Sequence, residues 1–352
     1  MVNVHVNVAP AYDVIIGRNL LSQAGEHIKN IRKPGVCAVI TDTNVEKLYL
    51  NTVLTSLKNE GFEPHAYAFL AGEESKNMET LTGILDFMSE IPLTRSDFVI
   101  ALGGGVTGDM AGFAAGVYMR GIPFVQIPTT SLAAVDSSVG GKTAVDLKNG
   151  KNLAGLFHQP CLVITDINTF STLSPENYAC GAAESIKMGV ISDPALFDIF
   201  EKCDAADFEE EIVFRAVQAK ADIVQRDERE TGDRKLLNLG HTYGHAIERL
   251  SNFTLPHGHA VAVGLAMAAR AAKEMGDMDE NTAERIVYTL KRNDLPVKSD
   301  YETDRIFEAG KTDKKMAGKS LSLIVPKAIG QCEIRKIPLE EFETYISLGK
   351  KE

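Results

Sequence analysis

The sequence predicts an α/β domain with a parallel sheet at residues 1–170, followed by a mainly α-helical domain at residues 171–352. Two observations lead to this prediction. In the first part, short β-rich runs alternate with amphipathic stretches, and strands separated by helices indicate a parallel sheet with right-handed crossovers. After about residue 170, helical patterns dominate instead. A chain of 352 residues is long enough for two such domains.

The elements follow one another in a clear order along the chain. Residues 44–61 form an amphipathic segment between two of the strand candidates. Ser174-Pro175 and Asp193-Pro194 each predict a helix start, because a capping side chain precedes a proline. Residues 320–337 resemble a short hairpin. The expected strands of the first domain are 2–8, 12–17, 35–42, 65–70, 97–104, 123–128 and 161–166.

Composition excludes several classes of protein. The net charge is −11, and the lysines and arginines form no basic run, which argues against a nucleic-acid partner. The first residues alternate as a strand does and do not form a signal peptide, and no apolar run reaches membrane-spanning length. Five scattered cysteines fit reduced thiols, and we therefore expect a cytoplasmic protein.

A glycine loop follows the strand predicted at 97–104. Gly103, Gly105 and Gly108 satisfy G-x-G-x-x-G, and the chain then turns helical. Glycines let the backbone approach a pyrophosphate, and a helix start presents free N–H groups to it. This pattern indicates a Rossmann-like, nucleotide-binding domain, although a simple tight turn explains it equally well. Asp42 follows another strand, where it is either a ribose ligand or a helix N-cap.

Two further stretches carry polar side chains in unusual settings. Residues 128–152 are rich in small and hydroxyl residues and have the composition of a ligand-facing loop. On the helix expected at 174–191, Glu184 and Lys187 are spaced i, i+3 and share one face. From spacing alone, this pair is best explained as an ordinary ion pair on a helix surface.

Four of the eight histidines lie between residues 241 and 259. His241 and His245 are one helical turn apart, close enough to share a metal, and His257 and His259 follow in a loop. The glutamate of HExxH is absent, which argues against a zinc protease. The spacing predicts a metal site but leaves open which imidazoles bind.

Motifs along most of the chain, from about residue 12 to residue 337, together resemble the 3-dehydroquinate synthase family. They occur in this order: GGGVTGD, RGIPFVQIPTT, VDSSVGGKT followed by KN, AAESIKMG, LNLGHTYGHAIE, HGHAVAVG and DKK. The resemblance implies a dehydroquinate synthase-like fold and a homodimer that binds NAD and a divalent metal, zinc or cobalt, in a cleft between domains. It also implies conversion of 3-deoxy-D-arabino-heptulosonate 7-phosphate to 3-dehydroquinate and phosphate. The steps would be transient oxidation by NAD, phosphate elimination, re-reduction, ring opening and aldol cyclisation.

The same resemblance implies roles for individual residues. The metal ligands would be Glu184, His241 and His257. Substrate-binding positions would be Asp136, Lys142, Lys151, Asn152, Lys187, Lys220, Arg234, Asn238, His245 and one lysine of the DKK motif, Lys314 or Lys315. Of these, the catalytic ones would be Lys142, Lys187, Arg234, Asn238 and His245, while Arg120 would reach the neighbouring subunit. NAD would contact Asp42, Asn44, Glu73, Lys76, Gly104, Gly105, Val106, Asp109, Thr129, Thr130, Asp136, Lys142, Lys151, Thr169, Phe170 and Thr172.

Two positions depart from the family pattern, and three other functions remain as alternatives. Asn177 replaces a glutamate on the NAD side, and His259 replaces the glutamate of HGEAV. Metal-dependent alcohol and glycerol dehydrogenases share the glycine loop and a similar metal site, but they do not need the cationic set that includes Arg234. Another sugar phosphate cyclase is the second alternative, and the set Arg234, Asn238 and His245 counts against it because some of these relatives replace them. A non-catalytic metal- or nucleotide-binding protein is the third alternative.

Overall fold

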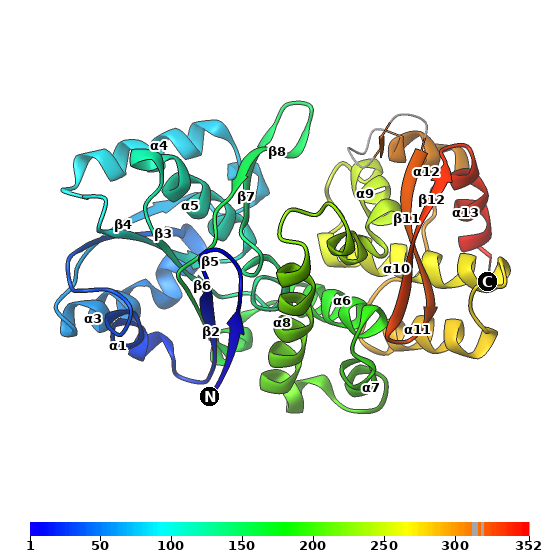
Figure 1. Ribbon diagram of the computed structural model, residues 1–352, viewed down its shortest axis with the longest axis horizontal. Helices are drawn as coiled ribbons and strands as arrows, with labels where there is room; N and C mark the ends of the chain where they lie inside the picture. Colours follow the sequence, from blue (N-terminus) through cyan, green and yellow to red (C-terminus); the bar gives the residue numbers. More distant parts are fainter. Residues whose placement is uncertain (312–315, 318–319, 352) are drawn as a thin grey trace. The chain divides into compact units, whose positions relative to one another are not determined.

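The computed structural model describes residues 1–311, 316–317 and 320–351. The chain forms two compact units, Met1–Leu173 and Ser174–Glu352, each with buried apolar residues of its own (Figure 1). Within the described residues, no helix combines the length and the apolar character needed to cross a bilayer.

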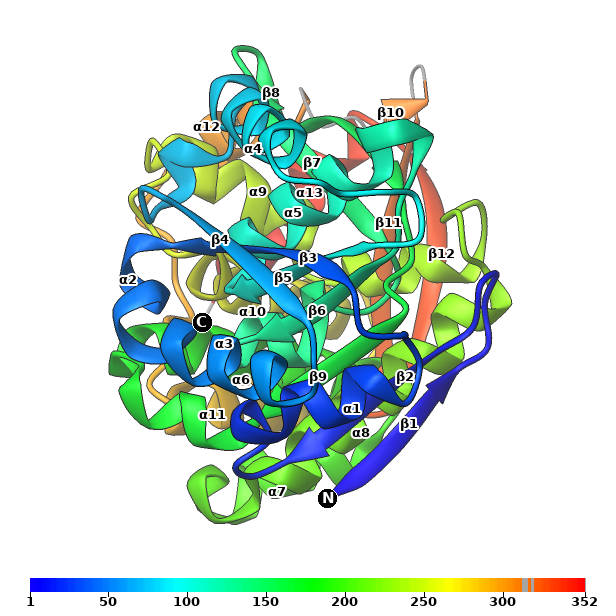
Figure 2. The same ribbon diagram turned by 90° about the vertical axis from the view of Figure 1, so that its left-hand side faces the viewer.

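A seven-stranded sheet forms the centre of the first unit (Figure 2). Its strands lie in the order β1-β2-β9-β6-β5-β3-β4. All seven predicted strands are confirmed, each within two residues of the expected ends. Their bounds are Val2–Val6 (β1), Tyr12–Gly17 (β2), Val36–Asp42 (β3), Glu63–Phe69 (β4), Phe98–Gly103 (β5), Phe124–Pro128 (β6) and Leu162–Asp166 (β9).

The sheet is parallel except at one edge. Strands β2, β9, β6, β5, β3 and β4 pair in parallel, as predicted. Strand β1 pairs antiparallel with β2, with Val4 opposite Val14, so the prediction of a parallel sheet is wrong for this strand. The physical reason is the short connection at residues 7–11, because a parallel crossover needs a dozen or more residues.

Helices cover both faces of this sheet. On β5, Phe98, Ile100 and Leu102 pack into one core with α1 (Ala24–Lys29) and α3 (Asn51–Asn59). Val99 and Ala101 point the other way, into a core with α4 (Met78–Glu90) and α5 (Gly105–Val117). Figure 2 shows the two pairs of helices on opposite sides of the sheet. Because β2, β9, β6, β5, β3 and β4 run parallel, their carboxyl ends lie at one edge of the sheet, where such sheets bind ligands.

A separate hairpin lies in the stretch that composition predicted as a ligand-facing loop. β7 (Lys142–Leu147) pairs antiparallel with β8 (Gly150–Phe157). The loop prediction is therefore wrong for most of residues 142–152. Thr143 and Val145 are buried while their neighbours are more exposed, and this alternation is the period of a strand. The many small and hydroxyl residues obscured that period in the sequence.

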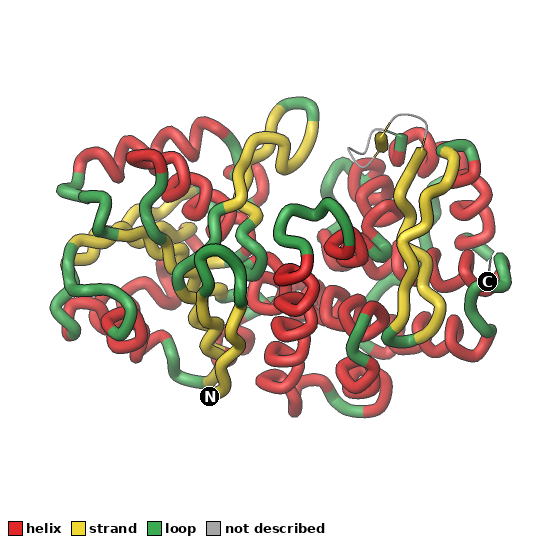
Figure 3. The backbone as a smooth tube through the Cα atoms, viewed as in Figure 1, coloured by secondary structure: helices red, strands yellow, loops and turns green. Residues whose placement is uncertain are grey.

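Helices dominate the second unit (Figure 3). Both predicted helix starts are confirmed: Ser174 accepts a hydrogen bond from the first turn of α6, and Asp193 does so for α7. Two strands, β11 (Ser320–Ala328) and β12 (Gln331–Pro338), form the predicted hairpin. The longer helices are α6 (Pro175–Ile191), α7 (Pro194–Lys202), α8 (Glu209–Arg226), α9 (His241–Leu250), α10 (His257–Glu274), α11 (Glu280–Arg292), α12 (Thr303–Gly310) and α13 (Glu341–Gly349).

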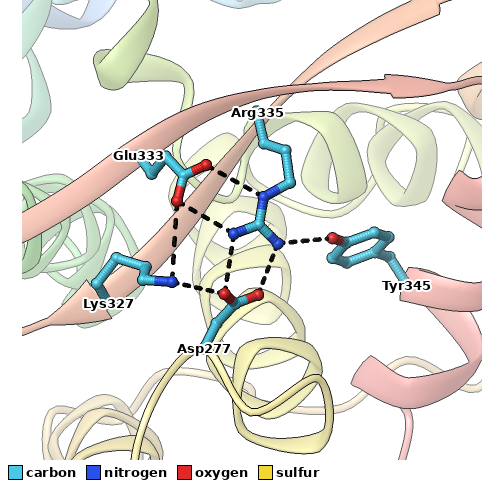
Figure 4. A network of polar contacts seen from close by, with 5 residues as sticks. All are labelled: Asp277, Lys327, Glu333, Arg335 and Tyr345. Carbon is cyan, nitrogen blue, oxygen red and sulfur yellow. Dashed lines mark hydrogen bonds and ion pairs between the residues drawn. The ribbon is translucent and has the colours of Figure 1, made fainter.

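A polar network ties this hairpin to the helices beside it (Figure 4). Asp277, just after α10, accepts two hydrogen bonds from Arg335 on β12, at 2.7 and 2.8 Å. Lys327 on β11 donates to the same carboxylate at 2.5 Å, and Arg335 also contacts Tyr345 of α13 at 3.1 Å. The bonds from Arg335, together with Lys327, lower the pKa of Asp277 to about 2 although burial opposes them.

Replacing Asp277 by asparagine is expected to destabilise the second unit. A carboxylate whose pKa falls from 3.8 to about 2 on folding contributes on the order of 2 kcal/mol of stability. That contribution is complete above the unfolded pKa of about 4 and is lost as the pH falls through the folded pKa. Thermal unfolding of Asp277→Asn should therefore lie below wild type at neutral pH, and the gap should close toward pH 2. A gap that is independent of pH would contradict this account.

Candidate active site

Glycines bring the histidine-bearing helices α9 and α10 into close contact. Gly240, just before His241, has a left-handed backbone with φ 77°. A Cβ on Gly264 would lie 2.0 Å from the carbonyl oxygen of Gly240, and one on Gly244 would lie 2.9 Å from that of Ala260. No side chain fits in either space. The first residue of α9, His241, is thereby held against α10.

Another glycine holds the start of α10 against α6. A Cβ on Gly258 would lie only 2.4 Å from the Cα atom of Cys180. Cys180 is one helical turn before Glu184, so the two residues share a face of α6. This contact therefore brings His257, the neighbour of Gly258, to the face of α6 that carries Glu184.

Replacing Gly258 by alanine is expected to separate α10 from α6. The added methyl group meets backbone, which cannot rotate away, so we expect a loss of about 1–3 kcal/mol of stability and weaker zinc binding. Thermal unfolding and a zinc titration of the variant would measure the two effects. A variant as stable as wild type, with unchanged zinc affinity, would show that this contact does not position the helices.

Glu184, His241 and His257 converge on one point. One ligand atom of each lies within 4.8 Å of the other two. The Glu184 Oε1 atom is 3.5 Å from His241 Nε2 and 3.4 Å from His257 Nε2. The glutamate side chain is 1% exposed, and its charge is met by Lys187 and by the imidazole of His257. A buried carboxylate and two imidazoles so placed can hold a divalent metal as three ligands and leave a position open.

Lys187 lies beside this cluster. Its Nζ atom is 2.5 Å from Glu184 Oε2, and both side chains are 1% exposed. The ion pair that the spacing predicts is therefore present, but its placement on the helix surface is wrong. Burial raises the pKa of Glu184, and the lysine charge with His257 more than offsets this, so the net shift is downward and the carboxylate stays ionised.

Both histidines of this cluster have their rings oriented by hydrogen-bond acceptors. His241 Nδ1 lies 3.2 Å from the carbonyl oxygen of Leu239. Because a carbonyl only accepts, Nδ1 carries the proton and Nε2 keeps its lone pair toward Glu184. At His257, burial lowers the pKa, but hydrogen bonds to Glu184 and Glu248 raise it to about 10.

The two other histidines of the cluster have different surroundings. His245 faces the same way as His241, with ring centroids 5.2 Å apart. It belongs to a second group with Glu248 and His257, whose ligand atoms also lie within 4.8 Å of one another. His259 is in neither group of the described residues. Burial lowers the pKa of His259, and the nearby Glu176 only partly opposes this.

Buried cations gather on neighbouring elements of the second unit. Lys187 on α6 is 1% exposed, Lys220 on α8 is 6% exposed, and Arg234 on the short helix η8 (Asp233–Asn238) is 2% exposed. These three elements pack against one another. Burying several cations is costly unless anionic groups offset the charge. Lys187 is offset by Glu184, and the three cations together concentrate positive charge in a chain whose net charge is −11, which suits an anionic ligand.

Acidic residues that the sequence did not single out shape the loop before α9. Asp227 accepts hydrogen bonds from three backbone N–H groups of the loop, including that of Arg234 at 3.1 Å. Burial raises the pKa of Asp227, but these bonds lower it to about 2. Glu230 accepts from the Asn238 side chain at 2.5 Å. In the sequence these acids lie in the charged run RDERETGDR, which gives no sign of their different roles.

In the first unit, the glycine loop forms the expected strand–turn–helix. Gly104 is the N-cap, and α5 begins at Gly105. A Cβ on Gly103 would lie 2.4 Å from the Thr107 hydroxyl. The backbone N–H of Thr129 donates to the Gly103 carbonyl at 2.9 Å, while the buried Thr129 hydroxyl lacks a hydrogen-bond partner among the described residues. A free helix start beside an unsatisfied hydroxyl fits a phosphate-bearing ligand.

Five residues predicted for ligand binding form a polar cluster around Asp109 in α5. Lys76 Nζ lies 2.6 Å from Asp109 Oδ2 and donates to Asn152 Oδ1 at 2.6 Å. Lys151 Nζ lies 3.1 Å from Glu73 Oε1. Burial raises the pKa of Asp109, and the charge of Lys76 offsets this only in part. The hairpin β7–β8 thereby joins the segment after β4.

Asp42 is a helix N-cap, as one of its two interpretations held. Its Oδ1 atom accepts from the backbone N–H groups of Asn44, at 2.9 Å, and Val45, at 3.1 Å. Its other oxygen accepts from the Thr107 hydroxyl at 3.2 Å. This bond links the end of β3 to the glycine loop. Asp42 can therefore cap the helix and still lie beside a phosphate-bearing ligand at the start of α5.

Tyr49, which the sequence did not single out, contacts two of the residues predicted to bind NAD. Its hydroxyl lies 2.5 Å from the Thr172 hydroxyl and 3.2 Å from the Thr169 carbonyl oxygen. Phe170, between these threonines, is buried. Tyr49 lies in an amphipathic segment, where its spacing looks like that of an ordinary helix residue.

The remaining predicted residues take no part in the contacts described above, and their positions are as follows. Arg120 is exposed and has a left-handed backbone, φ 70°. Asp136 is half-buried in the helical turn at 133–137, and Lys142 is exposed at the start of β7. Val106 lies in the first turn of α5, and Thr130 accepts a hydrogen bond at 3.2 Å from the backbone of the next turn. Lys314 and Lys315 lie outside the described residues.

Comparison with known proteins identifies related sequences. Two family models match consecutive parts of the chain: 3-dehydroquinate synthase N-terminal at residues 66–180 and 3-dehydroquinate synthase C-terminal at residues 181–316. The 3-dehydroquinate synthase of Enterococcus faecalis is 41% identical over 343 residues, which cover 96% of each chain. That of Pelobacter propionicus is 42% identical over 346 residues, again 96% of each chain.

Solved structures share the fold. A 2-deoxy-scyllo-inosose synthase complexed with carbaglucose-6-phosphate, NAD⁺ and Co²⁺ superposes with a TM-score of 0.88 at 26% identity, covering 98% of this chain and 99% of that one. A 2-epi-5-epi-valiolone synthase from Streptomyces hygroscopicus with NAD⁺ and Zn²⁺ has a TM-score of 0.87 at 27% identity, covering 96% of both chains. An iron-containing alcohol dehydrogenase has a TM-score of 0.66 at 16% identity over 97% and 98% of the two chains, which shows a common fold alone.

Proposed function

The chain belongs to the 3-dehydroquinate synthase family, and we propose that it converts 3-deoxy-D-arabino-heptulosonate 7-phosphate to 3-dehydroquinate and phosphate. This reaction is a step of the shikimate pathway of aromatic amino acid biosynthesis. The carrying observation is the convergence of Glu184, His241 and His257 in a unit that also buries three cations. The substrate bears an alcohol to be oxidised together with a carboxylate and a phosphate. It therefore needs both a metal and positive charge.

We assign the metal to Glu184, His241 and His257, with zinc or cobalt as the ion. The related cyclases that contain Co²⁺ or Zn²⁺ support this choice. When bound, such an ion lowers the pKa of a coordinated hydroxyl and favours its oxidation. Lys187 holds the glutamate in its ionised form, and the Leu239 carbonyl directs His241 Nε2 to the ion.

We assign NAD to the first unit, at the start of α5 and the adjoining strand ends. When bound there, NAD would supply reversible hydride transfer, and the net reaction would consume none. Gly104, Gly105 and Val106 offer backbone N–H groups to its pyrophosphate. The other assigned contacts are Asp42, Asn44, Glu73, Lys76, Asp109, Thr129, Thr130, Asp136, Lys142, Lys151, Thr169, Phe170 and Thr172.

The two anionic groups of the substrate account for the cationic residues. Lys187, Lys220 and Arg234 supply buried positive charge in the second unit. Asn238 and His245 bind polar groups of the substrate without adding fixed charge, and Glu230 orients the Asn238 amide. Asp136, Lys142, Lys151 and Asn152 of the first unit complete the proposed set, together with Lys314 or Lys315.

We further propose a cytoplasmic homodimer. Arg120 would contribute to the site of the neighbouring subunit; its exposed, left-handed position in a short turn fits a side chain that reaches outward. Size-exclusion chromatography with light scattering would measure the mass. A monomer with full activity would contradict this assignment.

The alternative functions fit less well. Other sugar phosphate cyclases are 26–27% identical to this chain, whereas 3-dehydroquinate synthases reach 42%. The alcohol dehydrogenases share only the fold at 16% identity, and their reaction does not require the buried cations. A non-catalytic binding protein would not need both the cluster of Glu184, His241 and His257 and the buried cations.

The proposed function is tested by supplying the purified protein with the heptulosonate phosphate, NAD and zinc. We expect phosphate release that depends on all three and stops when a chelator removes the metal. Glucose 6-phosphate, a sugar phosphate without a carboxylate, is the matched control and should release none. Absence of phosphate release from the heptulosonate phosphate would refute the proposal.

A further inference from the structure

His257 lies between two carboxylates from different helices. Its Nε2 atom is 3.4 Å from Glu184 Oε1, and its Nδ1 atom is 3.4 Å from Glu248 Oε2. Glu248 is 5% exposed, so its charge is almost fully removed from water. A buried carboxylate is costly unless its partners stabilise it, and here one of those partners is a metal-ligand histidine.

The sequence of α9 explains why this glutamate reaches the cluster. Glu248 lies seven residues after His241 and three after His245. These spacings are two turns and one turn of a helix, so the three side chains share one face. The close contact of α9 with α10 then brings that face to His257.

We propose that Glu248 is a positioning residue for the metal centre. It accepts the Nδ1–H of His257, fixes the ring and leaves the lone pair of Nε2 for the ion. This inference rests on the metal assignment made above. The Leu239 carbonyl does the same for His241. Partners of this kind typically change metal affinity 10–100-fold when removed.

A direct ligand role for Glu248 is the competing explanation. Glu248, His245 and His257 also lie close enough to hold an ion. That ion would use His257 Nδ1, whereas the ion at Glu184 uses Nε2. A neutral imidazole has a single lone pair, so it cannot serve both positions. Glu184 is the more buried of the two carboxylates, 1% against 5% exposed, and its Oε1 atom lies 3.5 Å and 3.4 Å from the Nε2 atoms of His241 and His257. This geometry favours the ion at Nε2.

The test compares the zinc affinity of full-length variants after removal of metal. Zinc is titrated in competition with a chromophoric chelator, and circular dichroism verifies folding. We expect Glu248→Ala to bind zinc about 10–100-fold more weakly. Glu248→Gln should stay within about threefold of wild type, because its amide oxygen still accepts the Nδ1–H. Its Co²⁺-loaded form should keep the visible absorption bands of wild type.

Glu201→Gln provides the matched control. Glu201, on α7, has an 11% exposed side chain and accepts two hydrogen bonds from Arg285, at 2.6 and 2.8 Å. It is a largely buried, paired glutamate of the same unit that belongs to neither metal-capable group. We expect this variant to bind zinc as wild type does. A loss equal to that of Glu248→Ala would show a general effect of stability and would overturn the proposal.

Other outcomes separate this inference from the proposed function. If the wild-type protein binds zinc and Glu248→Ala binds it with the same affinity, the role of Glu248 alone is overturned. Equal weakening in Glu248→Ala and Glu248→Gln would show that charge or direct ligation matters and not ring position. Absence of zinc binding by the wild-type protein would overturn the metal assignment of the proposed function as well.

Discussion

Replacing Glu184 by alanine is expected to empty the metal site and lower turnover by at least about 1,000-fold, or roughly 4 kcal/mol in the barrier. The carboxylate is the one acidic member of the triad and comes from α6, whereas both imidazoles come from α9 and α10. Its removal leaves two neutral ligands and the charge of Lys187, which repels a cation. Metal analysis after dialysis and a phosphate-release assay would measure both effects.

Glu176→Ala is the matched control for that variant. Glu176 lies in the first turn of the same helix and is exposed. Its removal changes the net charge by the same amount without touching the triad, so metal content and turnover should stay near wild type. One equivalent of tightly held zinc in Glu184→Ala would contradict the assignment of this ligand.

Replacing His245 by alanine is expected to leave the metal in place and reduce turnover by about 100- to 10,000-fold. His245 lies one turn after His241 on α9, but it is outside the triad of Glu184, His241 and His257. It is proposed to bind a polar group of the substrate or to transfer a proton. The measurement pairs zinc content with the kcat for phosphate release.

His259→Ala is the corresponding control. This histidine is outside both metal-capable groups of the described residues. The variant should keep both zinc and turnover. If His245→Ala proves empty of metal, the assignment of His245 to the substrate is refuted.

Much of the fold was predictable because its signals are local. The strands of the first unit are apolar runs bounded by turns, and their ends were placed within two residues. Ser174 and Asp193 predict helix starts because each is a capping residue followed by a proline. The antiparallel β1 and the hairpin β7–β8 were missed. The direction of β1 depends on the length of its connection to β2. In β7 and β8, small residues obscure the alternation of buried and exposed side chains.

The convergence of Glu184, His241 and His257 could not be predicted from spacing. The histidine cluster is visible in the sequence, but Glu184 is 57 positions before His241 and looks like half of a surface ion pair. Its place in the site depends on the packing of α6 against α10, which Gly258 permits. The family resemblance supplied what the local pattern did not.

Other residues of the site give even weaker signals. Asp227 and Glu230 occur in a charged run that has the composition of a solvated loop. Glu248 follows the histidines at helical spacing, but a glutamate there is most simply explained as a surface residue. Its burial becomes visible only when α9 and α10 are packed together.

The stoichiometry of hydride and phosphate tests the central claim most directly. The purified protein, supplied with the heptulosonate phosphate, NAD and zinc, should release phosphate over many turnovers while absorbance at the NADH wavelength stays flat. That result follows because the hydride taken from the substrate is returned within each turnover. NADH that accumulates in equal amount with consumed substrate would contradict the account and identify a dehydrogenase instead.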